Sequence, residues 1–240
     1  MKKYLLILLL GLSLKALAQA PATKIVPKLE QTSVVKDPDG LTLPYAVWKK
    51  MLETGEYSVK PVEKGSKEFV IYQLTEIEKS IRAERLKALI PAMGKPMASS
   101  SFKEGDKFVG ERITDMNGNK FDLKKISDKI YVINFWFIDC APCRDEIPEL
   151  NELVKQYKDN KDVVFLAIAL DDRYTIKQFL KTLPFSYNIV DDGRYYANKY
   201  GVKSYPTHVI IGKDGLIKFS TVGLAPHTMH WIEKTIKEQL

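Results

Sequence analysis

Cysteine is scarce in this chain: there are two in 240 residues, Cys140 and Cys143. A framework of several disulfides is therefore excluded, and one disulfide across so short a loop would stabilise the fold very little. Histidine is scarce as well, with three residues, none of them at a recognisable ligand spacing. Because a tetrahedral zinc site needs four ligands, we expect no metal at the cysteine pair.

A hydrophobic run long enough to cross a membrane is also missing. The apolar stretch Tyr4–Leu14 ends at Lys15 after 11 residues, whereas a spanning helix needs about 20. Lysines precede this stretch and the small residues Ala18-Gln19-Ala20 follow it, which matches the zones of a secretory signal. We expect residues 1–20 to be a signal peptide cleaved after Ala20, with no stable membrane insertion afterwards; a membrane anchor is the alternative.

The chain has no large excess of one charge. Its formal net charge is +7, and it falls to +4 without residues 1–20, which hold three lysines and no acids. Lysines alternate with acidic residues along the rest of the chain, as in an ordinary solvated surface. The sequence therefore argues against nucleic acid as a partner.

The region before residue 101 indicates a small α/β appendage. We expect a helix at 45–53, a strand at 69–72 and a helix at 75–90 whose buried stripe is Ile77, Ile81, Leu86 and Leu89. The stretch 91–101 is rich in small residues and proline and has no period, so we place a boundary near residue 101. Residues 21–101 would then be an N-terminal segment of unknown role with a linker, either a cap or a dimerisation element.

From residue 102 to residue 240, strand and helix signals alternate, as in an α/β domain with a partly parallel sheet. The stretch 130–138 is apolar on both faces except for Asn134, which indicates a central buried strand. Further strands are expected at 108–114, 121–123, 163–170, 187–190, 207–211 and 216–222, and helices after Cys140 and at 175–183, 195–200 and 228–239.

The cysteine pair stands where the strand at 130–138 meets a helix-forming segment. A sulfur at the first turn of a helix faces unpaired N–H groups and the positive end of the helix dipole, which favour the thiolate. We therefore expect Cys140 to be the nucleophile. Cys143 lies one turn further on the same face and can attack a mixed disulfide formed at Cys140. This chemistry needs no cofactor beyond the pair itself.

Several motifs in the same order resemble the thioredoxin superfamily, and specifically the TlpA/ResA-like thiol-disulfide oxidoreductases. The resemblance covers about residues 102–240 and implies a thioredoxin fold, a central mixed sheet flanked by helices. It rests on these segments: Asn134-Phe135-Trp136, Cys140-Ala141-Pro142-Cys143-Arg144, Glu146, Pro148, Tyr205-Pro206-Thr207 and Gly212-Lys213-Asp214-Gly215.

The resemblance also implies roles for residues around the dithiol. Pro206 is similar to the family's cis-proline, which lets residue 205 pair with an extended partner peptide, so Tyr205, Pro206 and Trp136 are candidate substrate-binding residues. Glu146 matches an acid that exchanges a proton with the resolving thiol, although a solvated helix glutamate is the plain alternative. Asn134 cannot act as a base, and we expect it to form a hydrogen bond inside the sheet.

Members of this family often act as periplasmic reductants, for example in cytochrome c maturation. The resemblance therefore implies a periplasmic enzyme that reduces disulfide-containing exported proteins and is recharged by a membrane electron donor. Two alternatives stay open. A thiol peroxidase would need a Thr and an Arg beside its cysteine, and Arg144 is present but no Thr closely precedes Cys140. The other is a non-catalytic thioredoxin-fold binding module.

Overall fold

The computed structural model describes residues 28–126 and 128–240. The expected signal peptide lies outside the described residues. The chain divides into two compact units, of which the first ends at Ile81 and the second begins at Arg82. Within the described ranges, none of the helices combines the length and the apolar character that crossing a bilayer requires.

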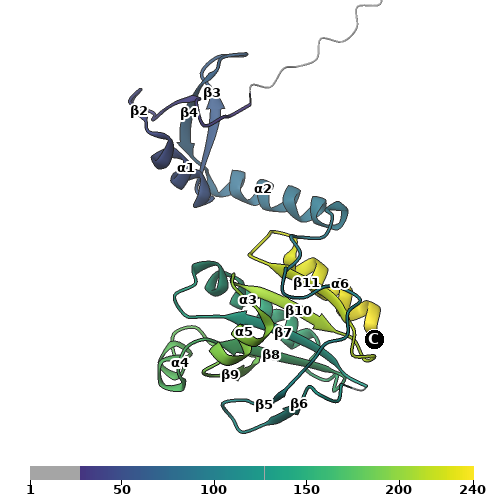
Figure 1. Cartoon of the computed structure of the whole chain (residues 1–240). Helices are drawn as coiled ribbons and strands as arrows, with labels where there is room; N and C mark the ends of the chain where they lie inside the picture. Colours follow the sequence, from purple (N-terminus) through teal and green to yellow (C-terminus); the bar gives the residue numbers. More distant parts are fainter. Residues whose placement is uncertain (1–27, 127) are drawn as a thin grey trace, which may run out of the picture. The chain divides into compact units, whose positions relative to one another are not determined.

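The first unit is a small α/β fold, as expected. Its sheet has the order β2-β1-β4-β3, with β1 and β4 parallel. Helix α1 packs against this sheet (Figure 1). Val35, Trp48, Phe69 and Ile71 form its buried core. The bounds are β1 Val34–Lys36, β2 Thr42–Leu43, α1 Tyr45–Glu53, β3 Tyr57–Pro61 and β4 Glu68–Gln73. Sequence reasoning placed α1 and β4 but did not predict β2 or β3.

Helix α2, Glu76–Leu89, corrects one expectation. It has no buried residue, and the four side chains of its predicted buried stripe are 37–73% exposed. Charged residues surround these four positions on every side of the helix, so the apolar side chains do not form one continuous face. The prediction of a buried stripe was wrong because it weighed spacing without the flanking charges. A short 3-10 helix, η1 Ile90–Ala92, follows.

The segment after η1 packs on the second unit, so the division between the units falls earlier than residue 101. The carbonyl of Met93 accepts a hydrogen bond from Trp231 Nε1 at 3.2 Å. The carbonyl of Met97 accepts from the backbone N–H of Val222 at 3.0 Å and from Thr221 Oγ1 at 2.9 Å. These contacts fix the expected linker to the last strand and the last helix.

The second unit is built on a five-stranded mixed sheet of order β11-β10-β7-β8-β9. Strands β7, β8 and β9 are parallel, whereas β10 is antiparallel to both β7 and β11 (Figure 1). A separate hairpin, β5 with β6, precedes the sheet. The strands are β5 Arg112–Thr114, β6 Lys120–Asp122, β7 Ile130–Trp136, β8 Val163–Ala169, β9 Asn188–Val190, β10 Thr207–Ile211 and β11 Ile217–Val222.

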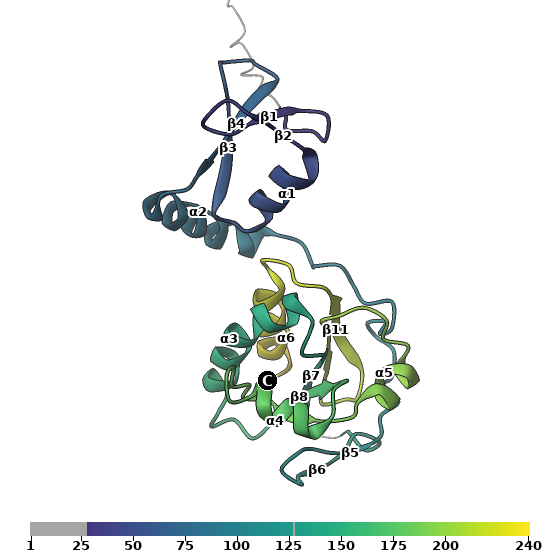
Figure 2. The same ribbon diagram turned by 90° about the vertical axis from the view of Figure 1, so that its left-hand side faces the viewer.

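Helices cover both faces of this sheet, which confirms the expected thioredoxin-like α/β architecture. The helices are α3 Ala141–Gln156, α4 Arg173–Phe179, α5 Arg194–Tyr200 and α6 Thr228–Gln239. Side chains of α3, α4 and α6 pack on one face, and α5 packs on the other (Figure 2). Because side chains alternate along a strand, each strand of the sheet contributes to both cores.

Candidate active site

The cysteine pair lies at the junction of β7 and α3. All of β7 is buried, and after a short loop Cys140 becomes the N-cap of α3, with Pro142 in the first turn. Proline is favoured there because the N–H it lacks would have no helical partner. Cys140 and Cys143 form a disulfide. The sulfur therefore stands at the helix N-terminus, as the sequence indicated.

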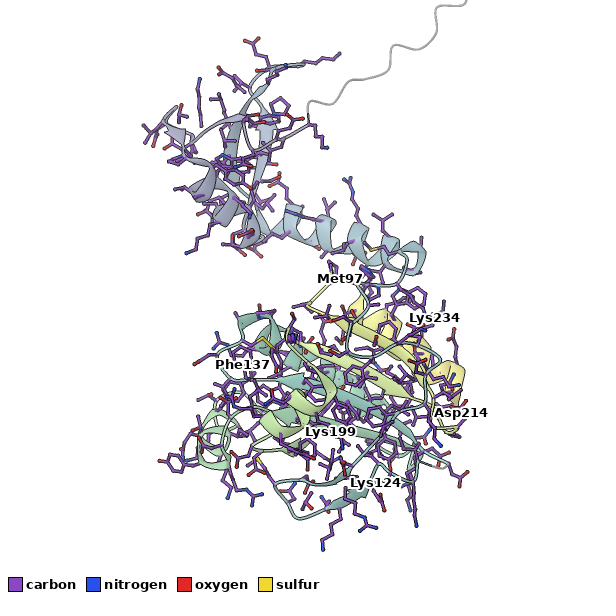
Figure 3. All side chains as sticks on the ribbon, viewed as in Figure 1. Met97, Lys124, Phe137, Lys199, Asp214 and Lys234 are labelled. Carbon is purple, nitrogen blue, oxygen red and sulfur yellow. A yellow bond between two sulfur atoms is a disulfide. The ribbon has the colours of Figure 1, made fainter. Side chains whose placement is uncertain are left out.

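Three hydrogen bonds hold the loop between β7 and the dithiol. The backbone N–H of Ile138 donates to Asp171 Oδ2 at 2.8 Å, and its carbonyl accepts from Arg144 Nη1 at 3.1 Å. The backbone N–H of Cys140 donates to the carbonyl of Phe137 at 3.2 Å. Figure 3 labels Phe137 on this loop and draws the disulfide as a yellow bond. The loop fixes the position of the first sulfur.

The two cysteines differ in accessibility. Cys140 is 6% exposed and Cys143 is 1% exposed, while Ala141 and Pro142 between them are exposed. The backbone N–H of Cys143 donates to Cys140 Sγ at 3.3 Å, which is the N-cap interaction. A partner can therefore reach the first sulfur more easily than the second, and the same helix terminus supplies an N–H donor to it.

The bond between Tyr205 and Pro206 is cis, as the resemblance implied. The ring of Tyr205 packs edge-on against Phe137, with 5.3 Å between the ring centroids. Burial raises the pKa of the Tyr205 hydroxyl above its ordinary value, so the phenol is neutral at physiological pH. Sequence reasoning missed Phe137. Its place directly after the buried strand, three residues before Cys140, was the available signal.

Trp136 lies in the core rather than on a partner-binding surface. It is 1% exposed and packs against Phe179 and Phe185, at 5.6 Å and 5.5 Å between ring centroids. As the last residue of β7, it points into the same core as both cysteines. A side chain with this burial is not accessible to a partner protein, and this corrects its expected role in substrate binding.

Glu146 is buried, which rules out the solvated alternative. Its exposed fraction is 2%, and Asn134 Nδ2 donates to its Oε1 atom at 2.8 Å. Asn134 thus forms a hydrogen bond inside the fold, as expected, and its partner is the glutamate itself. Glu146 stands three residues after Cys143, one turn along the same side of α3.

His208 is the second residue that sequence reasoning missed at this site. It is fully buried on β10, and its Nε2 atom lies 3.0 Å from Glu146 Oε2. The register pairs His208 with Asn134 of β7, but that pairing depends on the sheet and leaves no mark in the sequence. A buried tyrosine, Tyr187, also senses the charge of Glu146. Burial, with a smaller contribution from this charge, raises the pKa of the Tyr187 hydroxyl well above its ordinary value.

Within residues 28–126 and 128–240, no group of three or more His, Cys, Asp or Glu side chains could hold a metal ion. The chemistry that the described site offers is that of a disulfide at a helix N-terminus, a neutral aromatic pair beside it and a buried carboxyl–imidazole pair beneath it.

Sequence relatives place the chain in a family. It is 34% identical over 123 residues to thiol-disulfide oxidoreductase ResA of Bacillus thuringiensis (strain Al Hakam), a match that spans 50% of this chain and 69% of the relative. The chain belongs to the ResA-like thiol-disulfide oxidoreductases. ResA of Halalkalibacterium halodurans is 25% identical over 167 residues, which span 66% of this chain and 95% of that protein.

Two further comparisons agree with the ResA-like assignment. The AhpC/TSA family matches residues 104–220. A solved structure from Chlorobium tepidum, a candidate thiol:disulfide interchange protein DsbE, superimposes with a TM-score of 0.52 at 26% identity over 57% of this chain and 98% of its own. The thioredoxin fold and the enzyme class, thiol-disulfide oxidoreductase, are thus those that the sequence motifs implied.

Proposed function

We propose that this ResA-like enzyme is an exported reductant, in which Cys140 attacks the disulfide of a partner protein and Cys143 resolves the mixed disulfide. One observation carries this assignment of roles. Cys140, at the N-cap of α3, is the more exposed sulfur, and it accepts a hydrogen bond from the backbone N–H of Cys143. The helix N-terminus stabilises a thiolate at Cys140, the N-cap residue, more than at Cys143, which lies further along the first turn and is more buried.

The reaction transfers two electrons. The Cys140 thiolate attacks one sulfur of the partner disulfide, and the other partner sulfur leaves with the electron pair and takes a proton. Cys143 loses its proton and attacks Cys140, which releases the second partner thiol. The enzyme ends with the Cys140–Cys143 disulfide, and the partner ends with two thiols. Two electrons and two protons from a membrane donor restore the dithiol.

The proposed binding surface for the partner lies on the two loops that flank Cys140. Phe137 and Tyr205 offer a half-buried aromatic pair, and Ala141 and Pro142 offer exposed apolar atoms beside it. Pro206 is buried beneath this surface. An extended segment of the partner that pairs with the backbone of Tyr205 would bring the partner disulfide to Cys140. Extended peptides bind exposed strand edges in this way.

The deciding experiment traps the partner. In the Cys143→Ser variant the mixed disulfide at Cys140 cannot be resolved, so a covalent complex with the exported substrate accumulates. The matched variant Cys140→Ser should trap nothing, although it also keeps one cysteine. Complexes of equal yield in the two variants would refute the assignment of roles to the two cysteines.

The direction of electron flow needs a separate measurement. Reduction potentials of thioredoxin-fold proteins span about 150 mV. A redox titration of the Cys140/Cys143 couple against glutathione should place it at the reducing end of this range. A potential at the oxidising end would make the protein an oxidant of thiols instead.

A thiol peroxidase is the second candidate, because the AhpC/TSA family matches residues 104–220. Peroxide consumption and insulin-disulfide reduction, measured on the same sample, separate the two functions. We expect insulin reduction without appreciable peroxide turnover, since no Thr closely precedes Cys140. Peroxide turnover without disulfide reduction would make the peroxidase the better assignment.

A further inference from the structure

A buried polar cluster lies beneath the dithiol, and β10 supplies one of its members. Strand β10 runs between β7 and β11 (Figure 1), and its register sets His208 opposite Asn134 on one side and Thr221 on the other. Helix α3 crosses this face of the sheet and brings Glu146 to both strands. Glu146 Oε1 accepts from Asn134 Nδ2 at 2.8 Å, and Glu146 Oε2 lies 3.0 Å from His208 Nε2.

The Glu146–His208 pair is buried on a face of the sheet whose core is mainly apolar. Glu146 is 2% exposed and His208 is 0% exposed. The core residues of this face come from β7, β8, β10, β11, α3 and α6: Val132, Ala167, Ile210, Phe219, Ile147, Ile232 and Ile236. Other titratable side chains of the described residues belong to the same core: Cys140 and Cys143 at the start of α3, Tyr187 before β9, and Tyr157 and Tyr205 at its margin. Tyr187 stays neutral at physiological pH because burial raises its pKa.

An isolated carboxylate in such an apolar layer would be costly. With His208 beside it, Glu146 keeps a hydrogen bond in both of its charge states. When the pair carries one negative charge, imidazole Nε2–H donates to the carboxylate. When the pair has gained a proton it is neutral overall, as carboxyl with imidazole or carboxylate with imidazolium.

We propose that His208 is a positioning residue for Glu146, and that the hydrogen-bonded pair, rather than the carboxyl group alone, takes the proton of Cys143 in the resolving step. In this step the Cys143 S–H bond breaks and its proton passes to the pair. The thiolate attacks Cys140, the Cys140–partner S–S bond breaks, and the partner thiolate leaves with the electron pair. The inference rests on the proposed function, in which Cys143 resolves.

The placement of the pair supports this role. Glu146 follows Cys143 by one helical turn, so both side chains lie on the same side of α3. His208 contacts Glu146 from strand β10 of the sheet, whereas Cys143 and Glu146 both belong to α3. Moving the proton from Cys143 to the pair leaves the net charge of the buried region unchanged, since a thiolate replaces the negative charge of the pair. No bare charge has to be created in the apolar core.

The test compares wild type with His208→Gln, which keeps an N–H donor for the carboxylate but cannot take up a proton. Reduced protein reacts with 5,5′-dithiobis(2-nitrobenzoate) in two steps. The first release of thionitrobenzoate reports attack by Cys140, and the second reports attack by Cys143 on the mixed disulfide. We expect the second release to slow about tenfold at neutral pH in the variant, a part of the roughly 10²- to 10⁴-fold that a positioned acid or base contributes.

The pH profile separates positioning from a purely structural role. Loss of the imidazole removes a partner that can share the transferred proton, so the midpoint of the second-release profile should move to lower pH. His230→Gln is the matched control, because it removes a histidine from α6 outside the pair and should leave both releases unchanged. An unchanged profile in a folded His208→Gln variant would overturn the role of His208.

A measurement on wild type keeps the inference testable if the variant does not fold. The ring signals of His208, followed by NMR as a function of pH, should change at a different pH in the reduced and in the oxidised protein. Identical titrations in the two redox states would refute the coupling. If wild type shows no second release at all, Cys143 does not resolve, and the proposed function fails rather than the role of His208.

Discussion

The two faces of the five-stranded sheet are built from the same strands but differ in kind. On the α5 face the core is mainly apolar, with Ile133, Phe135 and Val209 among its members, and it holds no buried carboxyl–imidazole pair among the described residues. On the face covered by α3 and α6, the neighbours of these residues along the strands include Asn134 and His208, buried with Glu146. Both faces therefore provide stability, but only the face covered by α3 and α6 also holds the dithiol and the polar residues beneath it.

This difference shows how alternation along a strand separates stability from chemistry. Residues 133, 134 and 135 are consecutive, yet two of them fill an apolar core and one binds Glu146. Substitutions on the α5 face should change the free energy of unfolding without changing the chemistry of a folded molecule. Substitutions in the polar cluster should change both. Four variants, taken from the largest expected effect to the smallest, test this contrast.

Phe135→Ala should have the largest effect on stability. The side chain is fully buried and its ring lies 5.8 Å from that of Phe102 and 6.1 Å from that of Tyr200. Removing such a ring costs about 3–5 kcal/mol of unfolding free energy. Urea unfolding measures the loss, and insulin reduction per folded molecule should stay within about twofold of wild type. A large loss of turnover in folded protein would break the contrast between the faces.

Asn134→Leu removes the donor to Glu146 Oε1 with little change in volume. A buried acceptor without its donor costs about 1–3 kcal/mol. Unlike Phe135→Ala, this variant should also displace the pH profile of disulfide reduction. The matched control is Thr221→Val. Thr221 lies on β11 opposite His208, but its hydroxyl donates to the carbonyl of Met97 and not to Glu146. The control should lose about 1 kcal/mol and keep the wild-type profile; a displaced profile in the control would refute specificity for Glu146.

Ile133→Val is the conservative probe of the α5 face. The residue is 1% exposed, and deleting one buried methylene there costs about 0.5–1.5 kcal/mol. Thermal unfolding should show this loss, whereas the pH profile and the rate of the resolving step should match wild type. A changed profile would mean that the two faces are coupled through β7.

Asp191→Asn tests a partly buried carboxylate, 14% exposed, whose partner reaches the surface, and it should have the smallest effect. Arg173 Nε and Nη2 donate to Asp191 at 2.8 Å and 3.1 Å, and this hydrogen bonding lowers the pKa of Asp191. Because Arg173 is half exposed, the pair is worth only about 0.2–1 kcal/mol.

The pH dependence of this pair follows from the lowered pKa. Its contribution is present above the ordinary carboxyl pKa of about 3.9 and is lost as pH falls through the lower folded value. The stability difference between wild type and Asp191→Asn should therefore be constant from about pH 5 to pH 8 and shrink as the pH falls below the ordinary carboxyl pKa of about 3.9. A difference that persists in acid would contradict the ion pair as its source.

Much of the second unit could be predicted from the sequence because its strands are continuous apolar runs. The expected strand at 130–138 became β7, and the expected helix at 228–239 agrees with α6. The first unit was less predictable, since β2 has only two residues and β3 carries little alternation. The predicted stripe of α2 failed because charged residues interrupt it, so its four apolar side chains do not form one face.

At the site, the sequence by itself determined the two cysteines, the helix N-terminus that holds the first of them and the carboxyl group one turn beyond the second. These depend on residues close together in the chain, whose geometry a helix fixes locally. Only the tertiary structure decided that Trp136 is buried, that Phe137 meets Tyr205 and that His208 reaches Glu146. Those contacts join residues up to 68 positions apart, and the register of β10 against β7 sets them, because a shift by one residue would turn His208 to the opposite face.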